Sequence, residues 1–272
     1  MEIIKTIEEL QNIRKNINQT VGFVPTMGAL HNGHISLIKK AREENEIVIV
    51  SIFVNPTQFL PGEDLDAYPR KDEADKKICQ MCKVDYLFMP DNGTMYTKEE
   101  ILIKAPNKSY ILEGKTRPGH FDGVLQVVLK LFNLTQPTNA YFGKKDAQQL
   151  SLIQQMVKNL FLPINIVPCD IVRESDGLAL SSRNIYLTDQ QRKDALLISK
   201  SLYLATSLIA KKEYSVEAVK KRILDAMSTL DVEYVAIVDR EFNELEVVEP
   251  KNSIILVVVR FGNTRLLDNI WI

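Results

Sequence analysis

Apolar runs that alternate with helical patterns constrain the fold of this chain most strongly. Near-continuous apolar segments, without polar alternation, are typical of strands buried on both faces. The sequence predicts such strands at 21–25, 46–54, 85–89, 140–142 and 164–169. Helical patterns separate them at 34–44, 70–83, 121–134 and 145–160. This order predicts an α/β fold, a doubly wound parallel sheet of the Rossmann-like type with helices on both faces.

The pattern changes near residue 185, where strands and helices stop alternating. Thr188 precedes Asp189, Gln190 and Gln191, an N-cap signal for a helix of about twenty residues. A second helix is predicted at 215–228, and short strands are predicted at 233–238, 246–248 and 254–261. We therefore expect a Rossmann-like domain over residues 1–178 and a smaller α+β C-terminal domain, with an antiparallel sheet, over residues 179–272.

Composition excludes several classes of protein. The 272 residues are 45% hydrophobic and 25% charged, and 34 basic against 35 acidic side chains give a net charge of −1. Such a balance creates no overall field that would gather nucleic acid or an anionic membrane. The longest aliphatic run, residues 254–259, is far shorter than a membrane span, and the first residues lack the apolar segment of a secretion signal. We expect a cytoplasmic protein without nucleic-acid or membrane partners.

Three cysteines, an odd number, fit a reducing compartment. Cys79 and Cys82 form a C-x-x-C pair, but the pair closes a predicted helix, whereas a thioredoxin-like pair opens one. A zinc site would need two further ligands, and none lies nearby in the sequence. We expect two packed helix cysteines rather than a redox or metal site.

Two of the three histidines lie in the segment His31-Asn32-Gly33-His34, between a predicted strand and a predicted helix. The N-terminus of a helix favours phosphate, because its N–H groups are unpaired and its dipole is positive there. Imidazoles add hydrogen-bond donors or positive charge, and Gly28 and Gly33 let a nucleotide approach the backbone. The segment predicts a nucleotide site that is neither a P-loop nor a dinucleotide fingerprint. The alternative is a pair of surface histidines at a helix start.

The segment VGFVPTMGALHNGH, residues 21–34, resembles the H-x-G-H signature of the class I aminoacyl-tRNA synthetase and nucleotidyltransferase superfamily. Its longer part, PTMGALHNGH, resembles the pantoate–β-alanine ligase family, the pantothenate synthetases. Further blocks agree in order along essentially the whole chain: FVNPTQF (53–59), DLDAYPR (64–70), LEG (112–114), RPGHF (117–121), FGKKD (142–146), QQL (148–150), LSSRN (180–184) and FGNTRLLDN (261–269).

The resemblance implies an ATP-dependent ligation in the biosynthesis of pantothenate (vitamin B5) and coenzyme A. Pantoate and Mg-ATP would give pantoyl adenylate and pyrophosphate, and the amine of β-alanine would then release AMP and form the C–N amide bond. ATP as co-substrate, Mg²⁺ and a homodimer are implied with it. An adenylyltransferase of the same superfamily that acts on a phosphate ester is the alternative enzyme. A nucleotide-sensing module is the non-enzymatic one.

The resemblance also implies which residues hold ATP. They are Met27, Gly28, Ala29, Leu30, His31, Asn32, Gly33, His34, Gly143, Lys144, Lys145, Asp146, Val172, Leu180, Ser181, Ser182 and Arg183. His34, with His31 and Lys145, would be catalytic, and we expect His34 to stabilise charge at the α-phosphate, because attack by a carboxylate requires no proton transfer. Lys144 stands where the family usually has Glu, so it receives no role of its own.

The remaining implied residues serve the other ligands. Gln58 and Gln149 would bind pantoate, and Gln58 also β-alanine, because an amide bonds a carboxylate without neutralising it. Arg117 and His120 would support the site. Asp75 is the candidate magnesium ligand, with a solvated helix aspartate as the alternative. The 181–183 segment resembles a mobile phosphate-binding loop, so the C-terminal domain is predicted to be a lid that excludes water.

Overall fold

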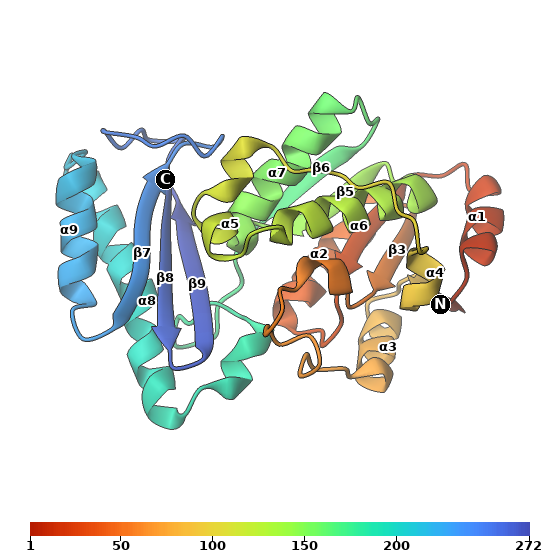
Figure 1. Ribbon diagram of the computed structural model, residues 1–272, viewed down its shortest axis with the longest axis horizontal. Helices are drawn as coiled ribbons and strands as arrows, with labels where there is room; N and C mark the ends of the chain where they lie inside the picture. Colours follow the sequence, from red (N-terminus) through yellow and green to blue (C-terminus); the bar gives the residue numbers. More distant parts are fainter. The chain divides into compact units, whose positions relative to one another are not determined.

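The computed structural model describes residues 1–272, which divide into two compact units, Met1–Asp170 and Ile171–Ile272 (Figure 1). This division falls earlier than the predicted boundary after residue 178. The reason is local: residues 172–180 fold back on themselves, with the Leu180 N–H donating to the Val172 carbonyl at 3.0 Å. Arg173 in this turn donates to both carboxylate oxygens of Asp268, at 2.6 and 2.9 Å, which ties the segment to the C-terminal sheet.

The N-terminal unit is built on a parallel sheet of six strands. These are β1 (Glu2–Ile4), β2 (Val21–Thr26), β3 (Ile47–Ile52), β4 (Tyr86–Phe88), β5 (Asn139–Gly143) and β6 (Asn165–Cys169). Their order, β1-β4-β3-β2-β5-β6, reverses direction between β2 and β5. Ligands of doubly wound sheets bind beyond the carboxyl ends of the strands at such a switch point. The predicted fold class is confirmed, and the segments after Thr26 and Gly143 border this crevice.

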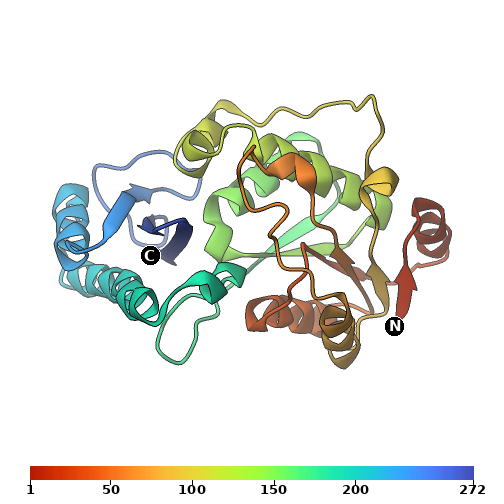
Figure 2. The ribbon, with the colours of Figure 1, turned by 60° about the horizontal axis from the view of Figure 1, so that its bottom comes forward.

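Helices cover both faces of the sheet, as Figures 1 and 2 show. The helices and 3₁₀ turns are α1 (Ile7–Lys15), α2 (Asn32–Glu44), η1 (Pro56–Gln58), α3 (Asp72–Met81), α4 (Asn92–Met95), η2 (Asn107–Tyr110), α5 (Glu113–Thr116), α6 (His120–Thr135), η3 (Lys144–Asp146) and α7 (Ala147–Asn159). α2 and α3 lie on one face, and α6 and α7 lie on the other. Successive residues of β2 serve the two sides: Val24 packs with Ile38 of α2, and the ring of Phe23 meets that of Phe132 in α6 at 6.3 Å.

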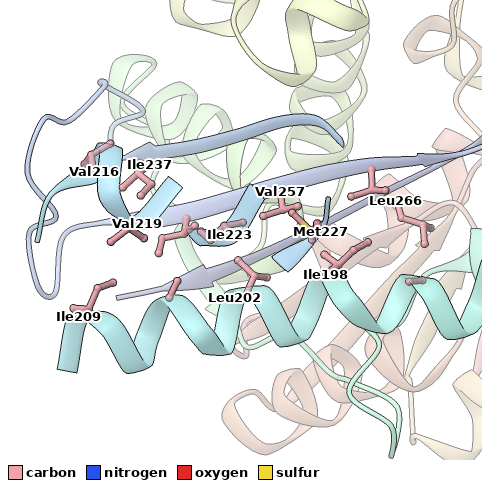
Figure 3. Packing of buried hydrophobic residues seen from close by; sticks show 14 of the residues in the cluster. Ile198, Leu202, Ile209, Val216, Val219, Ile223, Met227, Ile237, Val257 and Leu266 are labelled. Carbon is pink, nitrogen blue, oxygen red and sulfur yellow. The ribbon is translucent and has the colours of Figure 1, made fainter. Parts of the chain in front are cut away.

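The C-terminal unit packs two helices against a three-stranded antiparallel sheet, as the pattern predicts. Its elements are η4 (Ser182–Tyr186), α8 (Asp189–Ala210), α9 (Val216–Ala226), β7 (Asp231–Val238), β8 (Ile254–Phe261) and β9 (Thr264–Trp271), with the strands in the order β7-β8-β9. Figure 3 shows its core, in which Leu202, Ile223 and Val257 lie among other buried aliphatic side chains.

Two details of this sheet differ from the prediction. Residues 246–248 form no strand but only a bridge between Ser215 and Val247. The third strand is β9, which follows β8 through a tight turn at Gly262, where φ is +61°. Polar residues interrupt β9, so its sequence lacks the apolar run that marks the other strands.

The three cysteines are free thiols. Cys79 lies in α3 within the apolar cluster beneath the sheet, and burial raises its pKa to about 12. Burial also raises the pKa of the Cys82 thiol. A thiol that stays protonated is a poor nucleophile and a poor metal ligand, so these contacts fit packed helix cysteines. No helix of the chain combines the length and the apolarity that crossing a bilayer requires.

Candidate active site

In the loop after β2, protein side chains accept hydrogen bonds from the backbone N–H groups. Gly28 and Ala29 both have positive φ, +83° and +51°. Four successive N–H groups have acceptors: Gly28 donates to Thr26 Oγ1 at 3.2 Å, Ala29 and Leu30 donate to the two carboxylate oxygens of Asp75 at 2.8 Å each, and His31 donates to His34 Nδ1 at 3.3 Å. Asp75 of α3, together with Thr26 and His34, therefore fixes the shape of the loop, and the side chains beyond the loop remain to meet a ligand.

His31 and His34 form a reciprocal cap at the start of α2. His31 Nδ1 accepts from the Gly33 N–H at 3.1 Å, His34 Nδ1 accepts from the His31 N–H, and the ring centroids are 4.2 Å apart. A ring nitrogen that accepts carries no proton, so each neutral imidazole holds its proton on Nε2. Both rings therefore offer an Nε2–H donor that is not used by the cap.

Both imidazoles are neutral in this environment. Burial, with a smaller contribution from neighbouring His31, lowers the pKa of His34 to about 3. Burial also lowers the pKa of His31, and the Lys145 ammonium adds to the effect. Of the two possibilities raised by the sequence, donors or positive charge, the structure favours donors. Permanent positive charge beside them comes from Lys145.

The segment after β5 supplies the lysines. Gly143 ends β5, and Lys144, Lys145 and Asp146 form η3, which leads directly into α7. Lys145 Nζ lies 3.5 Å from Asp146 Oδ1. Lys144 Nζ lies 2.6 Å from Asp170 Oδ1, at the end of the neighbouring strand β6. This ion pair gives Lys144 a partner within the N-terminal unit.

Gln58 sits at the end of η1, which follows β3, and Asn55 holds it there. Asn55 is 1% exposed, and its Nδ2 donates to Gln58 Oε1 at 3.2 Å and to the Gly123 carbonyl at 3.1 Å. Its Oδ1 accepts from the Tyr96 hydroxyl at 2.7 Å. Because the side-chain oxygen of Gln58 already accepts a hydrogen bond from Asn55, the NH₂ group of Gln58 is the part of its amide left for a ligand. This group lies 3.0 Å from Met27 Sδ.

His120 and Arg117 hold the main chain of Gln58. The Gln58 carbonyl accepts from His120 Nδ1 at 2.8 Å and from Arg117 Nη2 at 3.3 Å. Arg117 also forms a two-point ion pair with Glu63, at 2.6 and 2.7 Å. Burial, with a smaller contribution from the Arg117 charge, lowers the pKa of His120 to about 4. Burial opposes ionisation of Glu63, but the hydrogen bonds and charge of Arg117 outweigh it and lower the Glu63 pKa.

The two glutamines of α7 differ sharply. Gln148 is buried, and its amide bonds the main chain of a neighbouring segment: Oε1 accepts from the Glu113 N–H at 3.1 Å, and Nε2 donates to the Ile111 carbonyl at 3.0 Å. Gln149 is half-buried, and its side-chain amide makes no hydrogen bond within the chain. Lys145 lies in η3 and Gln149 in the first turn of α7, so the predicted phosphate and pantoate ligands stand four residues apart in two consecutive elements.

Asp75 does not have the surroundings of a metal ligand. It is 1% exposed, and each of its oxygens accepts a backbone N–H from the loop. No group of three or more His, Cys, Asp or Glu side chains has an arrangement that could hold a metal ion. Mg²⁺ prefers several oxygen ligands and retains waters. The residues present therefore do not fit the predicted magnesium site at Asp75.

The predicted ATP residues of the C-terminal unit form a local cluster of their own. Val172 and Leu180 are joined by their backbones, and the Ser181 side chain caps η4 by accepting from the Arg183 N–H at 3.2 Å. Asn184 braces the same turn by donating to the Ala179 carbonyl at 3.0 Å. Ser182 opens η4.

The sequence did not predict roles for Asn55, Glu63 or Gln148. Each has a signal that can be identified only afterwards. Asn55 is a polar residue directly after a buried strand and before a proline, a position typical of a side chain that caps a turn. Gln148 lies within a matching block and Glu63 directly before one, but their partners stand far away in the chain, so spacing alone does not pair them.

Comparisons with known proteins identify the family to which the whole chain is similar. The family model described as Pantoate-beta-alanine ligase matches residues 2–271. A protein named pantothenate synthetase from Aliarcobacter butzleri is 84% identical over 272 residues, covering 100% of both chains. A crystal structure of pantothenate synthetase from Thermus thermophilus superposes with a TM-score of 0.94 at 40% identity, covering 100% of this chain and 99% of that one.

A third match bears on the ligands of a relative. A pantoate–β-alanine ligase from Francisella tularensis, solved in complex with an ATP analogue described as β-γ ATP and with β-alanine, superposes with a TM-score of 0.81 at 39% identity, covering 100% of this chain and 97% of that one. These full-length matches favour the ligase over the adenylyltransferase and over the sensing module. The chain therefore belongs to the pantoate–β-alanine ligase family.

Proposed function

We propose that this ligase joins pantoate to β-alanine in two steps at the switch point of the N-terminal sheet, with ATP as co-substrate. In the first step the pantoate carboxylate attacks the α-phosphorus of ATP, the bond to the β-phosphate oxygen breaks, and pyrophosphate leaves. In the second, the β-alanine amine attacks the carbonyl of the adenylate, AMP leaves with the electrons of the broken C–O bond, and the amine nitrogen loses one proton to water as the amide forms. The relative solved with β-γ ATP and β-alanine supports these ligands.

The observation that carries this proposal is the paired, neutral state of His31 and His34 beside Lys145. Negative charge grows on the phosphate oxygens during carboxylate attack, and fixed donors stabilise it without reorganising. The cap on each Nδ1 holds the two Nε2–H groups in place beforehand. Lys145 supplies the net positive charge. A neutral His34 fits charge stabilisation by hydrogen bonding, and no proton needs to be transferred.

The pantoate side follows from the amides. Gln58 offers NH₂ donors, because Asn55 holds its carbonyl oxygen. Such donors bind a carboxylate without forming an ion pair that would weaken it as a nucleophile. Gln149 has an amide without an internal partner, so both its donor and its acceptor groups remain for the hydroxyl and carboxylate groups of pantoate. Gln58 would also receive the β-alanine carboxylate.

We assign further contributions on the family resemblance. Gly143 to Asp146, Val172 and the 180–183 segment contribute to ATP binding, and residues 179–272 act as a lid that keeps water from the adenylate. Mg²⁺ enters as a chelate of the ATP phosphates, where it supplies additional positive charge. A homodimer working in the cytoplasm completes the proposal, and the three free thiols fit that compartment.

Isotope exchange tests the two-step chemistry. The enzyme should exchange labelled pyrophosphate into ATP when pantoate and Mg²⁺ are present and β-alanine is absent, and exchange should vanish when pantoate is omitted. Oxygen label in the pantoate carboxylate should appear in AMP after full turnover. Label in inorganic phosphate, with ADP as product, would mean an acyl-phosphate route and would refute the proposal.

A further inference from the structure

We propose that Asp75 is a positioning residue, whose carboxylate locks the left-handed turn at Gly28 and Ala29 and thereby aims His31 and His34. The inference rests on the proposed function, because it assigns the support of that same site. Asp75 belongs to α3, well outside the histidine segment in the sequence. It does not touch the reacting atoms, so its effect passes through the loop.

The contacts of Asp75 are those of a clamp. Its two oxygens accept the N–H groups of two consecutive residues, Ala29 and Leu30, both at 2.8 Å. The side chain is 1% exposed, so these charge-assisted bonds compensate for its loss of water. A carboxylate that spans two successive N–H groups fixes the peptide plane between them, because both bonds are satisfied in only one orientation of the backbone.

The turn that Asp75 holds needs such support. Ala29 has a φ of +51°, a conformation that a residue with a Cβ rarely adopts. Gly28, with a φ of +83°, lies so close that a Cβ there would stand 3.0 Å from Asp75 Oδ2. Ala29 and Leu30 are buried on one side of the turn, and on the other side Met27, Gly28 and Asp75 border a cavity of about 420 Å³.

The clamp connects directly to the histidines. Leu30 is followed by His31, whose N–H donates to His34 Nδ1, and the His31 ring in turn accepts from the Gly33 N–H. The direction of the His31 N–H depends on the peptide that precedes it. Release of the turn would therefore misplace the acceptor Nδ1 atoms and, with them, the two Nε2–H donors. Misplacement of a catalytic group by about 1 Å can cost ~10²-fold in rate.

Substitution with a magnesium titration separates this role from metal binding. Pantoate-dependent pyrophosphate exchange would be measured for the full chain, the Asp75→Asn variant and a matched control, Asp72→Asn, three positions earlier in α3. An asparagine can accept only one of the two N–H groups and turns a donor toward the other. We expect a loss of about 10²-fold in the exchange rate, with the Mg²⁺ concentration at half-saturation unchanged, and a near-normal rate for Asp72→Asn.

A second substitution, at Ala29, tests whether Asp75 acts by holding the turn. Glycine adopts a positive φ at low cost, so Ala29→Gly should make the turn less dependent on Asp75. We expect Ala29→Gly to raise the rate of Asp75→Asn by about tenfold more than it changes the rate of the wild-type chain. Gly28→Ala, which keeps the carboxylate but crowds it, should also lower the rate without shifting half-saturation by Mg²⁺.

Three results would overturn the proposal. Asp75→Asn with a normal rate would remove any role. Recovery of that variant at high Mg²⁺, with half-saturation raised tenfold or more and no effect of Ala29→Gly, would make Asp75 a metal ligand after all. A normal rate for Gly28→Ala would show that the turn is not critical, and this variant decides the question if Asp75→Asn does not fold. Exchange by the wild-type chain, read separately, reports on the proposed function alone.

Discussion

The two glutamines proposed to hold pantoate lie in regions that the chain supports very differently. Gln58 is restrained in both its side chain and its main chain. Asn55 donates to its side-chain oxygen, and His120 and Arg117 donate to its main-chain carbonyl oxygen. Gln149 projects from the first turn of α7 with no hydrogen bond to its amide. One side of the pantoate site is thus set before any ligand arrives, whereas the other takes its final orientation from the ligand. Mutations on the two sides should consequently fail in different ways.

The largest effect should come from His34, whose ring is also held before any ligand binds, by the cap at the start of α2. Replacing His34 with Ala should lower the adenylation rate about 10²–10³-fold, the usual cost of one stabilising donor, and should weaken substrate binding less. Single-turnover kinetics measure the two separately. His34→Gln places an NH₂ group near the position of Nε2, so it should lose less. Normal adenylation followed by slow attack of the amine would contradict the role given to His34.

Substitutions of Gln149 and of its neighbour Gln148 test the side of the site that has no internal hydrogen bonds. Gln149→Ala should lower pantoate-dependent exchange about 10²-fold and leave thermal stability unchanged, because its amide supports nothing in the free chain. Gln148→Ala is the matched control: it should destabilise the fold by about 1–3 kcal/mol, because it leaves buried main-chain groups unpaired. Calorimetry measures the stability of both variants, and the pyrophosphate exchange assay measures their activity. If Gln149→Ala lowered stability as much as Gln148→Ala, the contrast between the two regions would be lost.

The position of Gln58 can also be disturbed through Gly123 of α6, which packs against η1. A Cβ at Gly123 would stand 2.3 Å from the Thr57 carbonyl oxygen and 2.7 Å from the Gln58 nitrogen. Gly123→Ala should therefore push η1 away from α6, cost about 1–3 kcal/mol of stability and raise the KM for pantoate. Gly93→Ala is a suitable control, since its nearest atom would be an ordinary 3.5 Å away. An unchanged KM for pantoate would mean that Gln58 does not depend on this packing.

The smallest effect concerns pH. His34 and His120 have pKa values lowered to about 3 and about 4 in the folded chain, against about 6.5 when unfolded. Between these limits the unfolded chain binds protons that the folded chain does not. The contribution of these two histidines to the free energy of unfolding should therefore be complete near pH 7 and should decline as the pH falls from 6.5 toward 4. Denaturant titrations of the wild type and His120→Gln measure the difference. Equal slopes against pH would contradict the neutral state of His120.

Much of the fold follows from hydrophobic patterning, and the exceptions have physical causes. The parallel strands were predicted because both of their faces are buried, which makes their sequences uniformly apolar. β1, only three residues long and at the sheet edge, carries too little pattern to be predicted. β9 places polar and apolar residues in pairs after a tight turn, so it shows neither an apolar run nor a strict alternation, and the sequence did not predict it as a strand.

The site divides in the same way. The histidine segment could be predicted because strand, turn, helix start and imidazoles lie within a few consecutive residues. The supports of Gln58 could not, because Asn55, Arg117 and Glu63 meet through contacts between distant parts of the chain. Asp75 illustrates the limit well. The sequence marked it as an acidic residue near the site, and only its two hydrogen bonds distinguish a clamp from a metal ligand.

The strand order also bears on when the crevice can exist during synthesis. β2 pairs with β3 close behind it in the chain, but its other neighbour is β5, and the Val21 N–H reaches Thr138 across 117 positions. Pairings so distant in the chain form slowly and only after the later strand has been made. A nascent chain that has reached β4 thus carries the whole histidine segment but only one wall of the crevice. The two segments that border the switch point therefore come together only after β5 has been made.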